Sequence, residues 1–302
     1  MKTKKVYLVG AGPGKPDLIT VRGLNILKEA DVVIYDYLVD KSILENAKDG
    51  AELLCRQDRI NNLLVKKAKE GKKVVRLKNG DPSIFGRYSQ ELGILAKNNI
   101  DFEAIPGITA ATAGSSLSGI PLTDRRFASA CIFVTGLEDP AKKKSLIDWD
   151  GISKSGTIVL YMAVDNLDSI VSRLLAAGKN KDLPIAIIQD VGLITHRVLT
   201  GTLKDIARKA KKEKVKPPAI MIVGEVAKLE RKFNWLRKNK RVLFTGLSQE
   251  RFFIKGTYFH LPLIMIEPME DYKEFNNYLK DVNKFDWIVF TSRYGVEYFF
   301  RQ

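Results

Sequence analysis

Short apolar stretches alternate with amphipathic stretches along the first hundred residues. Four of the apolar stretches are rich in β-branched side chains and predict strands, and three amphipathic stretches repeat at helical spacing. The strands are expected at residues 6–9, 32–35, 74–77 and 102–105, and the helices at 18–29, 61–70 and 88–97, with Asp17 capping the first helix. This alternation is typical of an α/β domain with a parallel sheet covered by helices.

A second series of apolar stretches follows, and its spacing differs. It reads "ACIFVTG", "TIVLYMA", "PIAIIQD", "HRVLTGTL" and "PAIMIVGEV". A long polar stretch separates the first two, and the fourth follows closely on the third, so we expect a mixed sheet here. A third α/β unit is predicted from "RVLFTG", "LPLIMIEP", a helix in "YKEFNNYLKDVN" and a strand in "FDWIVFTS". The predicted domains are 1–113 and 114–230, then a basic linker at 231–240 and a small unit at 241–302.

Length and composition indicate a soluble globular protein. The chain has 302 residues, of which 45% are hydrophobic and 28% charged. No apolar run approaches the roughly 18 residues that a membrane helix needs, and "MKTKKVYLVGAG" is interpreted as the first strand, not a signal peptide. Two cysteines (Cys55, Cys131) and two histidines (His196, His260) exclude the usual zinc patterns and a disulfide framework, which fits a reducing cytoplasm.

The net charge of +15 suits an anionic partner. Nucleic acid, an anionic surface and a polyanionic small molecule all remain open on charge alone. Much of the charge lies in "KDIARKAKKEKVK" and "KLERKFNWLRKNKR", which we interpret as a solvated helix face and a linker. The sequence contains no recognisable RNA-binding module.

A glycine-rich loop, "GAGPGKPDLIT", follows the first predicted strand. It resembles the dinucleotide fingerprint G-x-G-x-x-G, and Asp36 ends the second strand where a ribose-binding acid would stand. Lys15, however, occupies the position of the third glycine, and Pro13 removes an amide that a phosphate nest would use. These differences disfavour a nicotinamide-linked oxidoreductase, which stays an alternative.

Several short motifs now occur in a recognisable order. They are "VGAGPGKPDLIT", "ADVVIYDYLV", "KKVVRLKNGDPSIFGR", "AIPGITAATA", "SGIPLTDR", "VTG", "VLYM", "RVLTGTL" and "PAIMIVGEV". Together they resemble the tetrapyrrole methylase family, and within it the branch that methylates uroporphyrinogen III. The resemblance implies two α/β domains with a cleft between them, a homodimer, and S-adenosylmethionine as methyl donor. It also implies methylation of two pyrrole carbons to give precorrin-2, on the way to sirohaem or cobalamin, with no metal and no nucleic acid.

The resemblance also assigns roles to particular residues. It makes Asp36 the catalytic base. Its donor-binding positions fall on Pro13, Asn79, Gly80, Asp81, Ile84, Thr109, Ala110, Met162, Val191 and Ala219. An arginine-lined cleft would suit a substrate with many carboxylates, because guanidinium groups bind carboxylates through two hydrogen bonds. The candidates are Arg22, Arg87 and Arg125, with Arg126 beside them.

The chain departs from the family pattern at four places. Asn79 stands where the family has glycine, Tyr88 and Ser89 replace two further glycines, and Val191 replaces another. The segment 51–62 contains no lysine, although the family's proposed proton donor is a lysine there. Arg56 is the nearest cation, and arginine does not release its proton near neutral pH.

The third unit resembles the start of uroporphyrinogen-III synthase. "EPMEDYKEF" and "FDWIVFTSRYGVEYFF" carry the resemblance, and Thr291 and Ser292 fall where that family contacts its substrate. That synthase closes two lobes on its ligand, so residues 241–302 alone are expected to lack synthase activity. The remaining alternatives for the whole chain are methylation of a later corrin precursor, of diphthine or of ribosomal RNA, and a non-catalytic binding protein.

Overall fold

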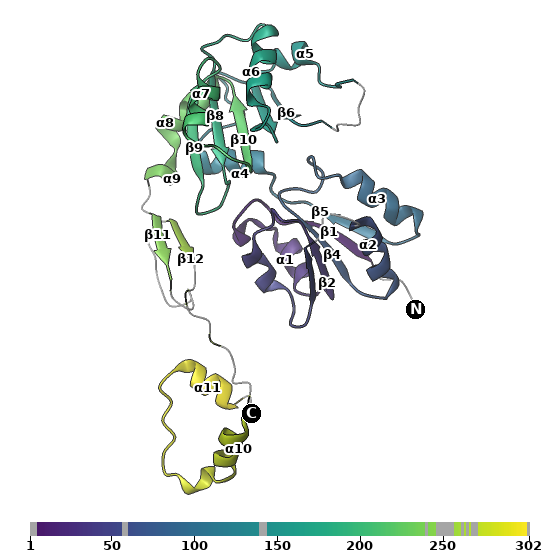
Figure 1. Cartoon of the computed structure of the whole chain (residues 1–302), viewed down its shortest axis with the longest axis vertical. Helices are drawn as coiled ribbons and strands as arrows, with labels where there is room; N and C mark the ends of the chain where they lie inside the picture. The colour runs from purple at the N-terminus through teal and green to yellow at the C-terminus, as the bar shows by residue number, and fades with distance from the viewer. Residues whose placement is uncertain are drawn as a thin grey trace. The chain divides into compact units, whose positions relative to one another are not determined.

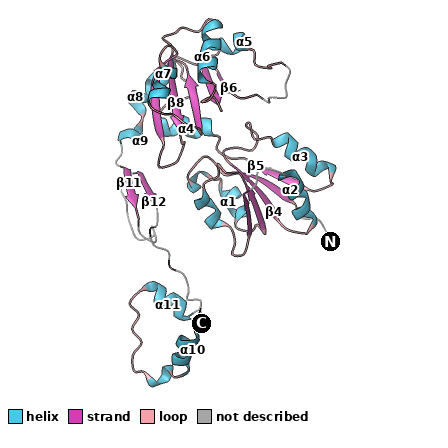
Figure 2. Ribbon diagram, in the orientation of Figure 1, coloured by secondary structure: helices cyan, strands magenta, loops and turns pink. Residues whose placement is uncertain are grey.

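The computed structural model describes residues 5–55, 60–138, 144–238, 241–245, 257–260, 263, 266 and 271–300. The chain folds into two compact units, Met1–Lys238 and Asn239–Gln302. Figure 1 labels their helices and strands along the chain, and Figure 2 distinguishes helices from strands by colour. Among the described residues, none of the helices combines the length and the apolar character that crossing a membrane requires.

The first sheet has five parallel strands. They are β1 (Val6–Gly10), β2 (Val32–Tyr35), β3 (Glu52–Cys55), β4 (Val74–Lys78) and β5 (Phe102–Ile105), in the order β3-β2-β4-β1-β5. All four predicted strands and the parallel sheet are confirmed. The prediction of four strands did not include β3, because this edge strand is mostly exposed and lacks an apolar run.

Helices cover both faces of this sheet. One face packs against α1 (Val21–Leu27) and the 3-10 helix η2 (Lys41–Asn46), and the other packs against α2 (Ile60–Lys69) and α3 (Tyr88–Lys97). Because side chains alternate across a strand, Val9 and Val33 enter the first core and Leu8 and Ile34 enter the second. Burial on both faces explains why β1 and β2 have continuous apolar runs.

The first helix begins later than predicted. Pro16–Leu18 forms a separate 3-10 helix, η1, and α1 starts at Val21. The cap is Thr20, whose hydroxyl accepts a hydrogen bond from the Gly23 amide at 3.1 Å, so the prediction that Asp17 caps this helix is wrong. Asp17 lies within η1, three residues before the cap.

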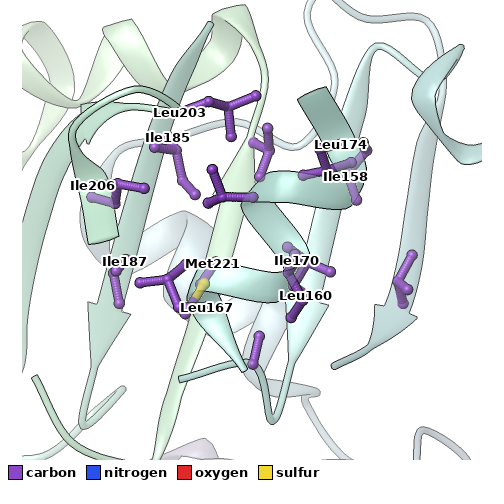
Figure 3. Packing of buried hydrophobic residues seen from close by; sticks show 14 of the residues in the cluster. Ile158, Leu160, Leu167, Ile170, Leu174, Ile185, Ile187, Leu203, Ile206 and Met221 are labelled. Carbon is purple, nitrogen blue, oxygen red and sulfur yellow. The ribbon is translucent and has the colours of Figure 1, made fainter. Parts of the chain in front are cut away.

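The second sheet is mixed, as predicted. Its strands are β6 (Cys131–Thr135), β7 (Thr157–Tyr161), β8 (Pro184–Gln189), β9 (Arg197–Thr202) and β10 (Ala219–Val223), in the order β6-β7-β10-β8-β9. Only β6 and β7 pair in parallel, and the other pairs are antiparallel. One face packs against α6 (Leu167–Ala176) and α7 (Ile206–Lys212), and the core between them, shown in Figure 3, includes Leu160, Ile187 and Met221. The short helix α5 (Trp149–Ser153) adds Ile152 to this core.

The opposite face of the second sheet packs against α4 (Ala110–Ser118), whose sequence "AATAGSSLS" consists almost entirely of small residues. A Cβ atom on Gly114 would lie 2.7 Å from Ile220 Cδ1, closer than side chains approach one another. Small side chains therefore let the helix backbone come close to the sheet. Because α4 directly follows the loop after β5, this packing connects the two halves of the unit.

Part of the predicted basic linker is helical and packed. The 3-10 helix η3 (Glu225–Leu229) leads into α8 (Glu230–Phe233) and α9 (Trp235–Lys238). The Trp235 indole donates to the Ser116 carbonyl of α4 at 2.9 Å. Gly119 ends α4 with φ +65°, and a Cβ there would lie 2.3 Å from the Phe233 carbonyl. Residues 230–237 therefore belong to the packed body of the first unit.

The second unit is only partly described. A parallel pair, β11 (Arg241–Phe244) and β12 (Thr257–His260), precedes α10 (Lys273–Lys280), the 3-10 helix η4 (Val282–Lys284) and α11 (Arg293–Phe300). The predicted helix is confirmed. Most of "LPLIMIEP" lies outside the described residues.

The strand predicted in "FDWIVFTS" is wrong, because residues 285–292 form no strand. A strand requires a neighbour that satisfies its backbone groups, and among the described residues no strand pairs with this segment. Trp287 is 85% exposed there. Ser292 instead accepts a hydrogen bond from the Gly295 amide at 3.1 Å, at the start of α11, and Thr291 is exposed beside it.

Candidate functional site

Three glycines pack against one another where β1, β4 and β5 end. A Cβ on Gly107 would lie 2.2 Å from the Gly80 carbonyl oxygen, and one on Gly10 would lie 2.6 Å from the Gly107 Cα. These contacts are between backbones, so no residue with a Cβ fits at position 10 or 107. The carboxyl ends of parallel strands are where ligands bind in open α/β sheets, and the glycines bring three of these ends together.

The glycine-rich loop packs on this cluster through its own backbone. Gly12 and Gly80 exchange two hydrogen bonds, with N···O distances of 3.2 and 3.0 Å. Gly12 and Gly14 have φ of +71° and +76°, and a Cβ on Gly14 would lie 2.6 Å from the Gly192 carbonyl carbon. The Gly12 amide is therefore used within the protein, and Pro13 has none. The compact turn is unlike a phosphate nest, which needs several free amides.

Asp81 fastens the loop that follows β5. One carboxylate oxygen accepts from the Ser83 amide at 2.8 Å and from the Ser83 hydroxyl, and the other accepts from the Gly107 amide at 2.8 Å. Gly80 has φ +71°, whereas Asn79 is not among the residues with positive φ. Asn79 therefore needs no left-handed backbone, and its replacement of a glycine creates no strain at this position.

Several of the predicted donor-binding residues gather around one apolar cluster. Val191 is buried in it, and Ile84 and Ala110 pack against it. Thr109 is the N-cap residue of α4, and Met162 follows β7 with 47% of its surface exposed. The structure thus brings residues from both halves of the unit to the strand ends.

The side chain of Ala219 points away from these residues. Along β10, Ile220 and Ile222 face the cluster beside α4, whereas Ala219 and Met221 face the core on the other side of the sheet. This follows from the two-residue period of a strand. Only the backbone of Ala219, which pairs with Gln189, faces the neighbouring strand end.

Tyr161 and Phe85 also belong to the site, although the sequence analysis missed both. The Tyr161 hydroxyl lies 2.6 Å from Thr109 Oγ1 and accepts from the Ala111 amide at 3.2 Å. Its ring packs against Phe85, which lies in the loop after β4, with 5.0 Å between ring centroids and the ring planes tilted by 59°. In the sequence both residues look like ordinary apolar positions, and only their place inside "VLYM" and "IFGR" could have indicated a role.

Three non-glycine residues here have a left-handed backbone. Phe85, Arg87 and Met162 have φ of 51°, 53° and 51°. Such conformations cost about 1–3 kcal/mol each and are found preferentially at functional sites, where the surrounding structure enforces them. Arg87 is also the N-cap residue of α3.

Asp36 lies at one end of a chain of alternating charges. Its Oδ1 accepts from Arg76 Nη2 at 2.5 Å, and Arg76 Nε donates to Glu91 Oε1 at 2.9 Å. The second Glu91 oxygen accepts from Lys78 Nζ at 2.8 Å. Arg76, Lys78 and Glu91 are almost fully buried, whereas the Asp36 side chain is 27% exposed.

This chain, Asp36–Arg76–Glu91–Lys78, contains two cations and two anions. Burial, followed by the nearby Arg76 charge, lowers the pKa of Lys78, and Glu91 opposes the shift. Among the described residues Asp36 Oδ2 accepts no hydrogen bond, so one oxygen is anchored and the other is available. The signal that the sequence analysis did not use is "VVRLK", in which two cations interrupt a strand that is buried along its whole length.

The candidate arginines fall into two groups. Arg22 forms an ion pair with Glu103, and Arg126 with Asp124, both near the surface. In the described part of the chain, no carboxylate pairs with the exposed side chains of Arg87 and Arg125. Arg56 lies outside the described residues. No group of three or more His, Cys, Asp or Glu side chains within the described ranges could hold a metal ion.

Comparison with known proteins gives two family matches. The model of the tetrapyrrole (corrin/porphyrin) methylases matches residues 5–207, and that of uroporphyrinogen-III synthase matches residues 255–302. A uroporphyrinogen-III C-methyltransferase of Methanocaldococcus jannaschii is 48% identical over 235 residues, 74% of this chain and 97% of the relative. A porphyrin biosynthesis protein of Ruminiclostridium josui is 36% identical across 98% of this chain, which spans 63% of that protein.

A solved structure agrees with these matches. The uroporphyrin-III C-methyl transferase of Thermus thermophilus, crystallised with S-adenosyl homocysteine, is 35% identical. It superposes with a TM-score of 0.67 over 74% of this chain and 94% of its own. From the fold, the strand-end glycines and these relatives together, the chain belongs to the tetrapyrrole methylases.

Proposed function

We propose that this protein transfers methyl groups from S-adenosylmethionine to two pyrrole carbons of uroporphyrinogen III, giving precorrin-2. The observation that carries the proposal is the junction of strand ends around Gly80 and Gly107, which is joined to the second sheet through Thr109 and Tyr161. The proposal is also supported by two relatives named as uroporphyrinogen-III methyltransferases, each of which matches 74% of this chain.

The residues at this junction fit such a donor. Met162 and Phe85 are partly exposed and offer an apolar surface to a sulfonium and an adenine, and Thr109 offers a hydroxyl. The donor, when bound, supplies an electrophilic methyl group to a nucleophilic carbon. Methyl transfer requires alignment above all, and positioning can lower a barrier by up to about 7–11 kcal/mol. The rigid packing of backbone on backbone at Gly10, Gly80 and Gly107 suits that requirement.

Asp36 is the proposed base that removes the proton from the methylated ring. One of its oxygens is held by Arg76, which fixes the carboxylate, and the other accepts no hydrogen bond from the described residues. A base must reach the proton through a free lone pair, and this arrangement leaves one available. Arg87 and Arg125, which are exposed and without an ion-pair partner in the described part of the chain, are the proposed contacts for substrate carboxylates.

The test of the function is direct. The protein is mixed anaerobically with uroporphyrinogen III and S-adenosylmethionine carrying a labelled methyl group, and the label is followed into the tetrapyrrole. We expect label at two ring carbons. If a folded protein binds the donor yet transfers no label, a non-catalytic binding protein is the better interpretation. If only a later corrin precursor, offered in place of uroporphyrinogen III, accepts the label, that precursor is the substrate.

The role of Asp36 has its own test. In Asp36→Asn the hydrogen bond to Arg76 can persist, so we expect S-adenosylhomocysteine affinity within about twofold of wild type, while turnover falls by roughly 10²–10⁴-fold. Glu29→Gln, at an exposed ion pair with Lys73 on the same half of the unit, is the control and should keep its turnover. Unchanged turnover in Asp36→Asn would remove Asp36 from the mechanism.

Three further expectations belong to this proposal. The protein acts as a homodimer, which light scattering on the purified chain tests. It works in the cytoplasm, in keeping with two cysteines that form no disulfide with each other. Residues 241–302 by themselves are expected to provide no uroporphyrinogen-III synthase activity, although the family model of that synthase matches residues 255–302. An assay for uroporphyrinogen-III synthase activity of the full chain checks this last point.

A further inference from the structure

Tyr161 joins three elements at the junction of the two sheets. It is the last residue of β7 and is only 9% exposed. Its ring packs on Phe85 from the loop after β4 and on Phe133 of β6, with centroid distances of 5.0 and 5.8 Å. Its hydroxyl reaches Thr109 at the start of α4. The hydroxyl therefore sits among residues of the proposed donor site without being one of the predicted contacts.

The hydrogen bonds of this hydroxyl constrain where its hydrogen points. The Ala111 amide can only donate, so the Tyr161 oxygen accepts that bond, at 3.2 Å. A phenol carries one hydrogen and is a stronger acid than an aliphatic alcohol, and accepting a hydrogen bond makes it a better donor still. The short 2.6 Å contact with Thr109 Oγ1 is thus best formed with Tyr161 as the donor.

Thr109 is free to accept this bond. Many threonines at the start of a helix accept a backbone amide through the side-chain oxygen, but Thr109 makes no such cap. With its oxygen accepting from Tyr161, the hydrogen of the Thr109 hydroxyl must point elsewhere. The Thr109 side chain is only half-buried, and its hydroxyl makes no other hydrogen bond with the described residues, so this hydrogen is available to a ligand.

We propose that Tyr161 is a positioning residue: by donating to Thr109 Oγ1, it holds the Thr109 hydroxyl as a hydrogen-bond donor toward an oxygen or nitrogen acceptor of the methyl donor. This rests on the proposed function. The bound acceptor is a lone pair on the ribose, the adenine or the carboxylate of S-adenosylmethionine. Burial raises the pKa of Tyr161, so the phenol keeps its hydrogen throughout the pH range in which the enzyme would be assayed.

The test is the affinity of the full chain for S-adenosylhomocysteine, measured by calorimetry. Tyr161→Phe keeps the ring and its contacts with Phe85 and Phe133 and removes only the hydroxyl. Because one hydrogen bond contributes about 0.5–1.5 kcal/mol, the dissociation constant should rise roughly 2–13-fold. In the methylation assay, KM for S-adenosylmethionine should rise by a similar factor while kcat changes little. Tyr7→Phe, a ring in β1 beside Lys73, is the matched control and should bind like wild type.

A double-mutant cycle separates positioning from general support of the fold. Thr109→Val should weaken binding at least as much as Tyr161→Phe, and the double variant should bind no more weakly than Thr109→Val alone, because Tyr161 acts only through the Thr109 hydroxyl. Thr109→Ser restores the hydroxyl and should recover most of the affinity. Multiplied losses in the double variant, or wild-type affinity in Thr109→Val, would overturn the inference, even if Tyr161→Phe is poorly folded.

The outcome for the wild-type chain distinguishes the two proposals. If wild type binds S-adenosylhomocysteine and transfers label while Tyr161→Phe binds equally well, the positioning role fails and the proposed function stands. If wild type binds neither S-adenosylmethionine nor its demethylated product, the proposed function fails first, and the positioning role fails with it.

Discussion

The contribution of buried ion pairs to the stability of this fold can be measured at the carboxylate of Glu91. Its two oxygens lie 2.9 Å from Arg76 Nε and 2.8 Å from Lys78 Nζ, and all three side chains are at most 6% exposed. Glu91→Gln keeps the shape but removes the negative charge, which leaves two buried cations with Asp36 as the remaining carboxylate. Removing one partner of a buried ion pair destabilises a protein by about 3–5 kcal/mol.

A matched surface variant calibrates this magnitude. Glu103 also contacts two cations, Lys5 and Arg22, but these side chains are 42% and 68% exposed. Water and salt screen exposed pairs, so Glu103→Gln should cost about 0–1 kcal/mol. At about 2–4 °C per kcal/mol for a unit of this size, Glu91→Gln should lower the thermal midpoint by roughly 6–20 °C.

The assay is thermal and urea unfolding of the full chain, followed by far-ultraviolet circular dichroism for wild type and both variants. The double variant Glu91→Gln with Lys78→Met removes the unpaired cation as well, and it should be less destabilised than the sum of the single changes. The reasoning is refuted if the unfolding free energy of Glu91→Gln lies within about 1 kcal/mol of wild type, or if Glu91→Gln loses no more stability than Glu103→Gln. The charges of Asp36, Arg76, Glu91 and Lys78 would then not depend on one another as the geometry indicates.

Four other substitutions test separate parts of the structure. Lys78→Met removes a lysine whose pKa lies below its usual value of 10.5. Between the lowered pKa of Lys78 in the folded wild type and about 10.5 in the unfolded chain, the unfolded chain binds more protons. The stability of wild type relative to this variant should therefore rise with pH up to about 10.5. A flat or falling difference in urea unfolding free energy would contradict the lowered pKa. Gly107→Ala places a Cβ 2.2 Å from the Gly80 carbonyl, so we expect a loss of about 1–3 kcal/mol or more together with weaker S-adenosylhomocysteine binding. Gly93→Ala, in α3 with open space around it, should instead stabilise by about 0.5–1 kcal/mol, and equal effects of the two alanines would argue against the close glycine packing. Leu160→Ala deletes a side chain buried in the core beside α6 and should cost about 2–5 kcal/mol in urea unfolding, whereas a loss below about 1 kcal/mol would mean that this core is loosely packed.

The role of the glycine-rich loop depends on the segments that pack against it. In the sequence, Pro13 and Lys15 argue only that the loop is a poor phosphate cradle. In the structure, the Gly12 amide is bonded to Gly80 and Gly14 rests against Gly192, so the loop serves to bring backbones close together. The same glycines that suggest a nucleotide site are needed because no Cβ fits between these segments.

Local pattern was sufficient to predict most of the architecture. The strands and the two sheet types follow from the pattern of apolar side chains. A strand buried on both faces has a continuous apolar run, and a strand buried on one face alternates apolar and polar residues. The exposed edge strand β3 and the helix cap at Thr20 were missed, since the first has few buried side chains and the second depends on a single hydroxyl. The segment 285–292 has the right composition for a strand but no partner among the described residues.

The chemistry of the site was decided by tertiary structure. Asp36 is joined to Arg76, 40 positions away, and Thr109 to Tyr161, 52 positions away. No local period encodes such pairs, because their closeness depends on which strands and helices become neighbours. The sequence determined which residue types stand at the strand ends. Only the folded chain determined which of their oxygens and hydrogens are already used and which remain available to a ligand, because hydrogen-bond partners are set by distances in space.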